Sequence, residues 1–301
     1  MKLAVTGGTG FVGAHLIDQA LEAGHAVNAL TRRTQPVRDG VTWIAGDLAD
    51  RLALKQLVEG ADAVIHVAGV LSARKEAEFE QGNVLSTQAV LDAAATAGVR
   101  RFVHISSLAA REPSLSMYGA SKARAEALVE QSGLAWVIVR PPAVYGPGDK
   151  ETLELFRMAR RRLIAMPPAG RASYLHVDDL SRLLVVLARV NVPAATILEP
   201  DDGRPGGWSH RQFGAALAEA VGVPAITVET PRLVLEWGAR LDRLIRGHGA
   251  KLTPDRVAYF CHSDWTVDPA KAPPPGLWAA RVDTPRGLKD TASWYRAQGW
   301  L

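Results

Sequence analysis

The sequence predicts an α/β fold in which a doubly wound parallel sheet carries helices on both faces. Short apolar, strand-like segments alternate with helix-like segments through the first half of the chain, and this alternation is typical of βαβ units. The first strand-like segment also runs directly into a glycine-rich turn that opens a helical pattern. The 301 residues are 48% hydrophobic and 22% charged, which is enough for a sizeable core in a globular protein.

The glycine-rich turn, Thr6 to Gly13, has the form of a phosphate-binding turn at a strand–helix junction. Gly7 permits a tight turn, Gly10 leaves the backbone open to a pyrophosphate, and Gly13 lets the helix pack closely on the strand. The free N–H groups at the start of the helix would then face the anion. The residues expected to contact a dinucleotide here are Gly7, Thr9, Gly10, Phe11, Val12 and Gly13.

Further strands and the domain division follow from the same pattern. Strands are predicted near residues 2–5, 26–31, 41–45, 62–67, 101–106 and 135–139. After Pro141 the alternation changes, and proline clusters and a glycine-rich loop near residue 203 interrupt it. We therefore expect a dinucleotide-binding domain over 1–165, to which part of 170–200 returns, and mainly a smaller substrate-binding lobe over 166–301.

The end of the second strand bears on the choice of cofactor. An Asp or Glu at this position would hydrogen-bond the ribose 2′-hydroxyl of NAD. Here Thr31 is followed by Arg32 and Arg33, with no acid. Because guanidinium groups hold a 2′-phosphate in charge-assisted bonds, NADP is the expected cofactor and NAD remains possible. The alternative is that both arginines are simply solvent-facing loop residues.

Tyr118 and Lys122 form the second chemical signal. They lie four residues apart at the head of a helical stretch that reaches about Glu130, so they share one helix face. A free phenol has a pKa of about 10, and an adjacent cation lowers this pKa. The tyrosine of such a pair could then act as a general acid or base near neutral pH. A lone pair at this spacing is often only a surface pair. Just upstream, however, the strand near 101–106 runs into Ser106 and Ser107, at the strand end where open parallel sheets bind ligands.

Together these motifs resemble the extended (atypical) branch of the short-chain dehydrogenase/reductase superfamily, the NAD(P)-dependent epimerase/dehydratase family with a Rossmann fold. The resemblance is strongest to the group that includes dihydroflavonol reductases and 3β-hydroxysteroid dehydrogenases. It covers essentially the whole chain. Further matching segments are residues 47–48, 66–69, 140–148, 174–179 and 287–291.

The resemblance implies hydride transfer between a nicotinamide and a carbonyl or alcohol carbon. Tyr118 would give or take the hydroxyl proton, and Ser107 would hydrogen-bond the substrate oxygen, with Ser106 as the fallback. Lys122 would hold the nicotinamide ribose and lower the pKa of Tyr118. Asn83 would belong to the relay that carries protons to water.

The resemblance also adds cofactor contacts in the loops that follow the strands. Asp47 would reach the adenine amino group, although an aspartate here could equally cap a helix over Ala49 to Val58. The full set of added contacts is Asp47, Leu48, Val67, Ala68, Gly69, Lys122, Pro141 and Val144.

Three functions are compatible with this scaffold. The preferred one is an NADP(H)-dependent oxidoreductase acting on a small or hydrophobic carbonyl or alcohol. The first alternative is a nucleotide-sugar epimerase or dehydratase that retains its cofactor, but Pro142 and Ala143 stand where those enzymes often carry Phe-Asn. The second alternative is a non-catalytic NADPH-binding subunit, which is disfavoured because such subunits usually lose the Tyr or the Lys.

Charge and motif spacing argue against several other partners. The net charge of +4 is small for this length, and no aromatic residues interleave with the basic run Arg157 to Arg162, so we expect no nucleic acid. That run is interpreted as the solvated side of a helix whose apolar side holds Leu153, Phe156 and Leu163, with a phosphate contact as the alternative. No cluster has metal-ligand spacing, and His66 and His104 are expected in the core or beside a ribose.

The expected compartment is the cytoplasm. A single cysteine, Cys261, excludes an internal disulfide and suggests a reducing environment. Lys2 is followed almost at once by the glycine turn, so no secretory signal is expected, and no apolar run is long enough to span a bilayer. The expected partner is a small-molecule substrate, and a homodimer is possible.

Overall fold

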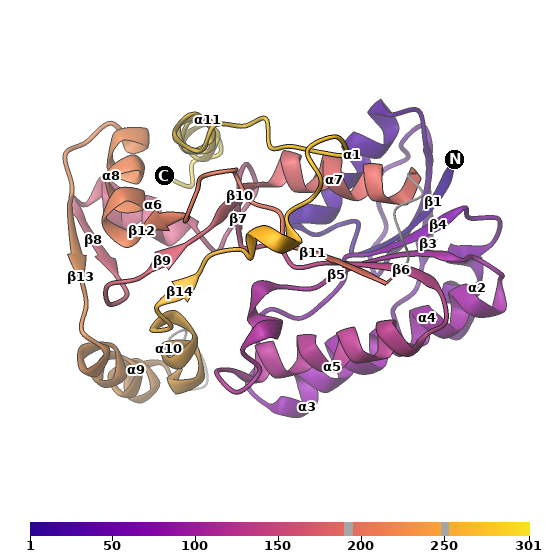
Figure 1. The fold of residues 1–301 in the computed structure, drawn as a ribbon, viewed down its shortest axis with the longest axis horizontal. Coiled ribbons are helices and arrows are strands. Elements are labelled where there is room, and N and C mark those ends of the chain that lie inside the picture. The colour runs from indigo at the N-terminus through magenta and orange to yellow at the C-terminus, as the bar shows by residue number, and fades with distance from the viewer. Residues whose placement is uncertain (190–194, 248–252) are drawn as a thin grey trace. The chain divides into compact units, whose positions relative to one another are not determined.

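The computed structural model describes residues 1–189, 195–247 and 253–301 (Figure 1). The chain forms two compact units. The first unit comprises residues 1–141, 177–200 and 271–279. The second unit comprises residues 142–176, 201–270 and 280–301. The first stretch of the first unit therefore ends at Pro141, whereas the sequence analysis placed this boundary near residue 165. Residues 177–200 belong to the first unit, within the range 170–200 from which a return was expected.

The first unit is built on a seven-stranded, all-parallel sheet with the order β11-β6-β5-β4-β1-β2-β3. The strands are β1 (Lys2–Thr6), β2 (Ala26–Thr31), β3 (Val41–Ala45), β4 (Ala63–His66), β5 (Arg101–Ile105), β6 (Ala135–Val139) and β11 (Thr196–Leu198). The first six each begin and end within one residue of the prediction. The sheet grows outward in both directions from β1, so the topological switch point lies between β1 and β4.

Helices cover both faces of this sheet, which confirms the doubly wound fold class (Figure 1). The helical elements are α1 (Phe11–Glu22), α2 (Arg51–Val58), α3 (Glu76–Phe79), a π-helical segment η1 (Glu80–Leu85), α4 (Ser86–Thr96), η2 (Leu108–Arg111), α5 (Met117–Gln131) and α7 (Val177–Arg189). Helices α1 and α7 lie on one face, and α2, α4 and α5 on the other. In α7, Leu180, Leu183, Leu184 and Leu187 are fully buried because they recur at helical spacing.

The second unit is smaller and mixed. Its elements are β7 (Ala143–Tyr145), α6 (Leu153–Arg160), β8 (Leu163–Met166), β9 (Arg171–Ala172), β10 (Tyr174–His176), β12 (Trp208–Ser209), α8 (His210–Val221), β13 (Ile226–Glu229), α9 (Arg232–Arg246), α10 (Pro254–Phe260), β14 (Asp264–Trp265) and α11 (Thr284–Ala297). Aromatic rings fill its core: Tyr174 stacks on Phe213 at 3.5 Å between centroids, and Phe156 meets Tyr295 edge-on. The remaining short helix, η4 (Pro269–Lys271), is where the chain passes from the second unit back into the first.

The basic run in α6 differs partly from expectation. Leu153 and Phe156 are buried as predicted, but the helix ends at Arg160, and Leu163 begins β8 with its side chain more than half exposed. Its assignment to the apolar side of the helix was therefore wrong. The turn is made at Arg162, whose φ is 67°. Arg157 pairs with Glu154 across one helical turn at 2.7 Å, as in a solvated helix face.

Candidate active site

The glycine-rich turn between β1 and α1 is shaped by close backbone approach. Gly7 has φ +73°, and a Cβ there would lie 2.8 Å from the backbone nitrogen of Ala68. A Cβ on Gly13 would lie 2.0 Å from the Gly7 carbonyl oxygen. Both positions therefore exclude any larger residue. At Gly10 a Cβ would meet only the Gly7 oxygen, at 3.3 Å, so the outer side of the turn is open.

The N-terminus of α1 opens onto this same side. Gly10 is the N-cap residue, and no side chain caps the helix. The backbone N–H groups of Phe11 and Val12 belong to the first turn, where no intrahelical acceptor exists. Thr9 and Gly10 are exposed. The open backbone and the positive end of the helix dipole fit a pyrophosphate, so this turn can hold the phosphates of a dinucleotide.

At the end of β2 the chain folds back on itself. The Thr31 hydroxyl donates to the carbonyl oxygen of Arg33 at 2.7 Å, and the Arg33 N–H donates back to that hydroxyl oxygen at 3.2 Å. Arg32 and Arg33 are both exposed, and neither guanidinium forms an ion pair with any residue in the described part of the chain. The Thr31 hydroxyl therefore bonds within its own turn. The two arginines lie after the end of β2, where the ribose of a dinucleotide would bind.

Asp47 shapes the loop after β3 but does not cap the helix that follows. Its Oδ1 accepts hydrogen bonds from the N–H groups of Ala49 at 2.8 Å and of Asp50 at 3.2 Å. The cap of α2 is Asp50, which accepts from Leu52 and Ala53. The helix-cap interpretation of Asp47 was therefore wrong by three residues. Asp47 closes a turn through Oδ1, and among the described residues its Oδ2 accepts no hydrogen bond.

Ser107 and Tyr118 are brought together by the packing of α5 on η2. The Ser116 hydroxyl caps α5 by accepting from the Gly119 N–H at 2.9 Å. A Cβ on Gly119 would lie 2.6 Å from the Ala109 carbonyl oxygen, so this glycine allows the two segments to approach closely. As a result Ser107 lies close enough to the Tyr118 hydroxyl to lower the pKa of the phenol.

Burial sets the proton affinity of Tyr118. It raises the pKa of the phenol to about 12, and the hydrogen bond with Ser107 opposes that rise. The sequence analysis expected Lys122 to lower this pKa, but the ammonium instead donates to the Ile105 carbonyl oxygen at 2.6 Å. Ser107 is the group that favours the phenolate here, and the influence of Lys122 on this pKa stays a prediction. At neutral pH Tyr118 is protonated.

Lys122 is almost fully buried. Burial lowers its pKa to about 8, and the charge of Glu126, one turn further along α5, partly opposes this. Ser106 differs from Ser107: its hydroxyl is buried and bonds to no group in the described residues. Of the two adjacent serines, the geometry favours Ser107 as the partner of Tyr118.

Asn83 lies in η1, and its side chain bonds to the loop after β4 and to helix α5. Its Oδ1 accepts from the Val70 N–H at 2.6 Å, and its Nδ2 donates to the Val70 carbonyl at 3.0 Å and to the Ser121 hydroxyl at 2.8 Å. The loop after β4, which contains Gly69, is thereby fixed to α5. Both N–H groups of the Asn83 amide and one acceptor position of its oxygen are used in holding the site together.

The buried His66 side chain, at the end of β4, links β1 to α4. Its Nδ1 lies 2.7 Å from the Thr6 hydroxyl and its Nε2 lies 3.1 Å from the Thr87 hydroxyl. Since Thr87 donates its proton to the Asn83 carbonyl at 2.6 Å, it must accept from His66, which places the ring proton on Nε2. Burial and the nearby Lys122 charge lower the pKa of His66 to about 3, so the ring is neutral. His104 stacks on it at 5.4 Å.

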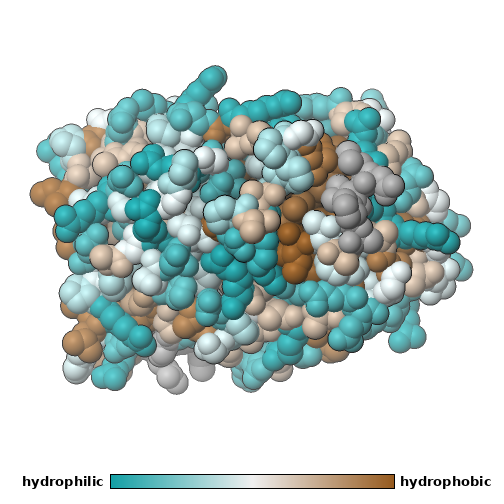
Figure 2. Space-filling view, in the orientation of Figure 1, coloured by the Kyte–Doolittle hydropathy of each residue, from teal (hydrophilic) through white to brown (hydrophobic). Residues whose placement is uncertain are grey.

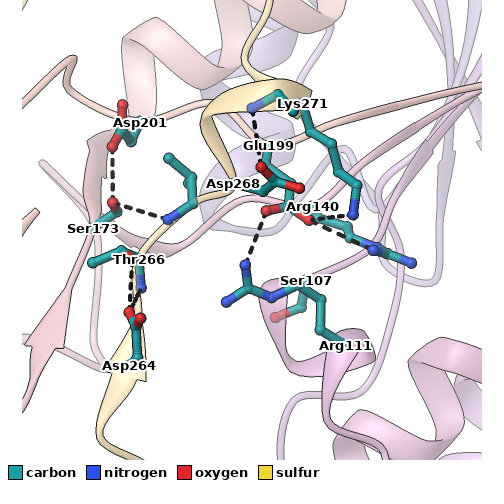
Figure 3. Close-up of polar contacts among 12 residues, drawn as sticks. Ser107, Arg111, Arg140, Ser173, Glu199, Asp201, Asp264, Thr266, Asp268 and Lys271 are labelled. Atoms are coloured by element: carbon teal, nitrogen blue, oxygen red, sulfur yellow. Dashed lines mark hydrogen bonds and ion pairs between the residues drawn. The ribbon is translucent and has the colours of Figure 1, made fainter. Parts of the chain in front are cut away.

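A buried charge cluster supports the back of the site (Figure 3). Glu199 is fully buried after β11 and pairs with Arg111 at 3.1 Å, with Arg140 at 3.5 Å and with Lys271 at 3.7 Å. Arg140 also forms a two-fold contact with Glu126 of α5, at 2.9 and 2.6 Å. Because Arg111 ends the turn that begins at Ser107, this cluster fixes that turn and α5 to the edge of the sheet.

The remaining predicted cofactor contacts divide between the units. Val67 and Ala68 follow β4 beside the glycine turn, and the Ala68 N–H donates to the Thr6 hydroxyl oxygen at 3.3 Å. Pro141 lies at the end of β6, where its carbonyl accepts from the Leu108 N–H. Leu48 packs against the core of the first unit. Val144 is the exception, since it lies in β7 of the second unit.

The second unit has a small hollow of its own, of about 180 Å³, beside the loop near Gly203. Its polar groups are paired: Asp202 accepts from Trp208 at 2.7 Å and from Thr284 at 2.6 Å. Arg204 lies over the Trp208 ring at 3.9 Å. Within the described ranges, no group of His, Cys, Asp and Glu side chains is arranged to hold a metal ion.

Sequence reasoning missed the supporting residues of the site, chiefly Glu126 and Glu199. A buried acid is recognisable in a sequence only when its cation is adjacent, and here the partners lie 14 to 88 residues away. Glu126 offered one signal, since it follows Lys122 by one helical turn.

Comparisons with known proteins point to one family. The profile of the NAD dependent epimerase/dehydratase family matches residues 3–197. A ceramide reductase of Caulobacter vibrioides is 37% identical, covering 99% of this chain and 96% of its own. A 4-hydroxy-2-methyl-3-oxo-4-farnesyl-3,4-dihydroquinoline-1-oxide ketoreductase of Stigmatella aurantiaca is 30% identical, covering 96% and 95%.

Solved structures are similar over the full length. MoeE5, solved with UDP-glucuronic acid and NAD, has a TM-score of 0.76 at 25% identity, and the match covers 99% of each chain. UDP-glucose 4-epimerase from Thermotoga maritima has a TM-score of 0.74 at 20% identity, with the same coverage, and this likeness concerns the fold alone.

Proposed function

This chain belongs to the NAD dependent epimerase/dehydratase family and is an NAD(P)-dependent enzyme of the oxidoreductase type, and we propose that it reduces a ketone on a hydrophobic substrate with NADPH. The observation that carries the proposal is that Ser107 and Tyr118 come together beside the buried Lys122, with Ser107 lowering the pKa of the phenol. The nicotinamide, when bound, supplies the hydride. The protein must orient the ketone, exclude water and deliver one proton.

The proton state of Tyr118 favours the reductive direction. A phenol with a pKa of about 12 is protonated at neutral pH, so it is ready to donate to the oxygen that becomes an alkoxide. Oxidation of an alcohol would need the phenolate, which burial disfavours. Ser107 would hydrogen-bond the same substrate oxygen. Lys122, held against the Ile105 carbonyl, would place its charge beside the nicotinamide ribose and the developing oxyanion.

The residues at the end of β2 support NADPH over NADH. Arg32 and Arg33 are exposed, and positions 31–33 hold no carboxylate that could hydrogen-bond a 2′-hydroxyl or repel a 2′-phosphate. Two guanidinium groups at this edge can bind the phosphate in charge-assisted hydrogen bonds. NADPH is also the dinucleotide that suits a net reduction.

The substrate class is inferred from the reductases that are similar over the whole chain. Their names describe ketones or reduction products with long apolar chains: a ceramide, a farnesyl quinoline and, at 29% identity in Stenotrophomonas maltophilia, a 2-alkyl-3-oxoalkanoate. We propose the same class here, a ketone on an apolar chain next to a polar head. The residues Pro142 and Ala143, which lack the amide expected for a diphosphate, agree with it.

The test begins with the purified protein. Any dinucleotide retained by it is identified by mass, and NADPH absorbance is then followed with a long-chain 3-oxo amide, a 2-alkyl-3-oxo acid and a short-chain 3-oxo ester. We expect NADPH-dependent reduction of at least one long-chain ketone. Tightly retained NAD with turnover of a UDP-sugar would replace the proposal with an epimerase. Binding of NADPH without turnover of any ketone would indicate a non-catalytic subunit.

A further inference from the structure

Helix α9 of the second unit carries its apolar side outward. Six large apolar residues of this helix are between 55% and 83% exposed: Leu233, Val234, Trp237, Leu241, Leu244 and Ile245. Among its described side chains, the buried one is the small Ala239, which is 1% exposed. A helix that only covers its own core turns its apolar stripe inward. In α9 the arrangement is reversed.

The exposed residues form one continuous face. Leu233, Trp237, Leu241 and Leu244 recur every three or four residues, so they line one side of the helix, and Val234 and Ile245 widen the stripe. A soluble monomer seldom leaves more than roughly 300 to 600 Å² of apolar surface in one patch, and larger patches mark protein or membrane contacts. In the space-filling view, hydrophobic residues show at the edge of the molecule where α9 lies (Figure 2).

The charges of α9 favour a membrane contact over a protein contact. The sequence of the helix holds four arginines against Glu236 and Asp242. Arg232 pairs with Glu236 at 2.8 Å, whereas Arg240 lies over the ring of Trp237 at 5.2 Å from its centroid. The helix therefore has an excess of two positive charges, which an anionic lipid surface attracts and which disfavours packing against a second copy of the same helix. Tryptophan and arginine are also the side chains that settle at the level of lipid headgroups.

We propose that α9 is a peripheral membrane-binding helix that inserts its apolar face into the surface of an anionic bilayer. A helix with a wide apolar stripe and an excess of arginines lies in the plane of the interface and does not cross it. Consistent with a surface location, no helix in the described residues is long and apolar enough to cross a membrane. If the proposed function holds, the same helix would bring the enzyme to a substrate that itself resides in the bilayer.

The test is cosedimentation of the full chain, without cofactor, with vesicles of phosphatidylglycerol and phosphatidylcholine. Trp237→Ser combined with Leu241→Ser should lower the partition coefficient at least tenfold. The matched control, Val37→Ser combined with Leu52→Ser, removes two exposed apolar residues of the first unit and should leave binding unchanged. Binding of wild type should weaken on pure phosphatidylcholine and at high salt, because the arginines contribute through screened charge.

Several results would overturn the proposal. One is the absence of wild-type binding to anionic vesicles. Another is light scattering that shows a wild-type dimer, dissociated in the double variant, with no vesicle binding; the face would then join two copies of the chain. Thermal unfolding checks that the variant is folded. If it is not, the wild type is tested with brominated lipid, which quenches tryptophan fluorescence when α9 inserts and leaves it unchanged when α9 does not. Failure of every ketone assay leaves this measurement unaffected, so the two proposals fail separately.

Discussion

Replacing Lys122 by methionine should abolish turnover and at the same time stabilise the protein. The ammonium is almost fully buried, and burial lowers its pKa to about 8 from an ordinary value of 10.5. At about 1.4 kcal/mol per pH unit, keeping this group charged costs the folded protein about 3 kcal/mol below pH 8. Methionine has a similar length and no charge, so Lys122→Met removes that cost.

The gain in the free energy of unfolding is smaller than this, because Lys122→Met also removes a hydrogen bond. Lys122 donates to the Ile105 carbonyl at 2.6 Å, and leaving a buried acceptor without this donor costs about 1 to 3 kcal/mol. The net increase in the free energy of unfolding is therefore about 1 kcal/mol at pH 7, which corresponds to a rise in Tm of about 2 to 4 °C. Lys55→Met, at an exposed lysine in α2, is the matched control and should show neither effect.

The pH dependence gives the sharper measurement. Because the folded pKa of Lys122 lies below the unfolded one, the unfolded chain binds more protons between pH 8 and 10.5, and stability should rise with pH across that window. Denaturant unfolding at pH 7, 8.5 and 10 should show this rise in wild type and lose its Lys122 contribution in Lys122→Met. A variant that is less stable than wild type at pH 7, or that keeps the full pH slope, would refute the assignment of a costly buried charge.

Three further experiments, with five substitutions, test the site and the cofactor. Tyr118→Phe should lower kcat by about 10² to 10⁴ while NADPH binding changes only a few-fold, because only the transferable proton is lost, as steady-state kinetics and calorimetry would show. Ser107→Ala should lower kcat and raise the pKa of Tyr118, whereas Ser106→Ala should do neither, which a pH–rate profile distinguishes. Thr31→Asp combined with Arg32→Ala should shift the preference from NADPH to NADH by tenfold or more, since a charged contact contributes about 1.5 to 3 kcal/mol.

The corresponding contrary results are specific. Retention of most of kcat in Tyr118→Phe would remove the phenol as proton donor. Equal loss of activity at both serines would mean that their roles cannot be separated by hydrogen bonding. Equal wild-type affinity for NADH and NADPH would return Arg32 and Arg33 to the solvated surface, and Arg100→Ala, at an exposed arginine elsewhere in the first unit, supplies the control.

The fold of the first unit was predictable because its signals are local. Each buried parallel strand appears in the sequence as a short apolar run, and the turn after β1 is recognisable from glycines that sterics require, as at Gly7 and Gly13. The division of the chain between the two units was harder to predict from the sequence. The return of part of 170–200 was expected, but the end of the first stretch at Pro141 and the return of residues 271–279 depend on contacts that no local pattern records.

The candidate site shows the same contrast between local and distant information. Tyr118 and Lys122 lie on one helix, so their spacing was visible. The pKa of Tyr118 was not, because it depends on burial and on Ser107, which is separated from it by a turn and a cap. The exposed face of α9 was recorded in the spacing of its apolar residues, but spacing cannot tell whether such a stripe faces inward or outward.

The buried polar groups around Lys122 explain how one charge can be kept in this core. His66 and His104 are both neutral, since burial and the lysine charge lower the pKa of each. A neutral His66 can accept from Thr6 and donate to Thr87, and so holds the strand end and η1 without adding a second cation. Because the countercharge, Glu126, is shared with Arg140, it only partly relieves the burial of Lys122. The ammonium therefore stays close to losing its proton, and a negative charge developing on a substrate oxygen beside Tyr118 would stabilise it.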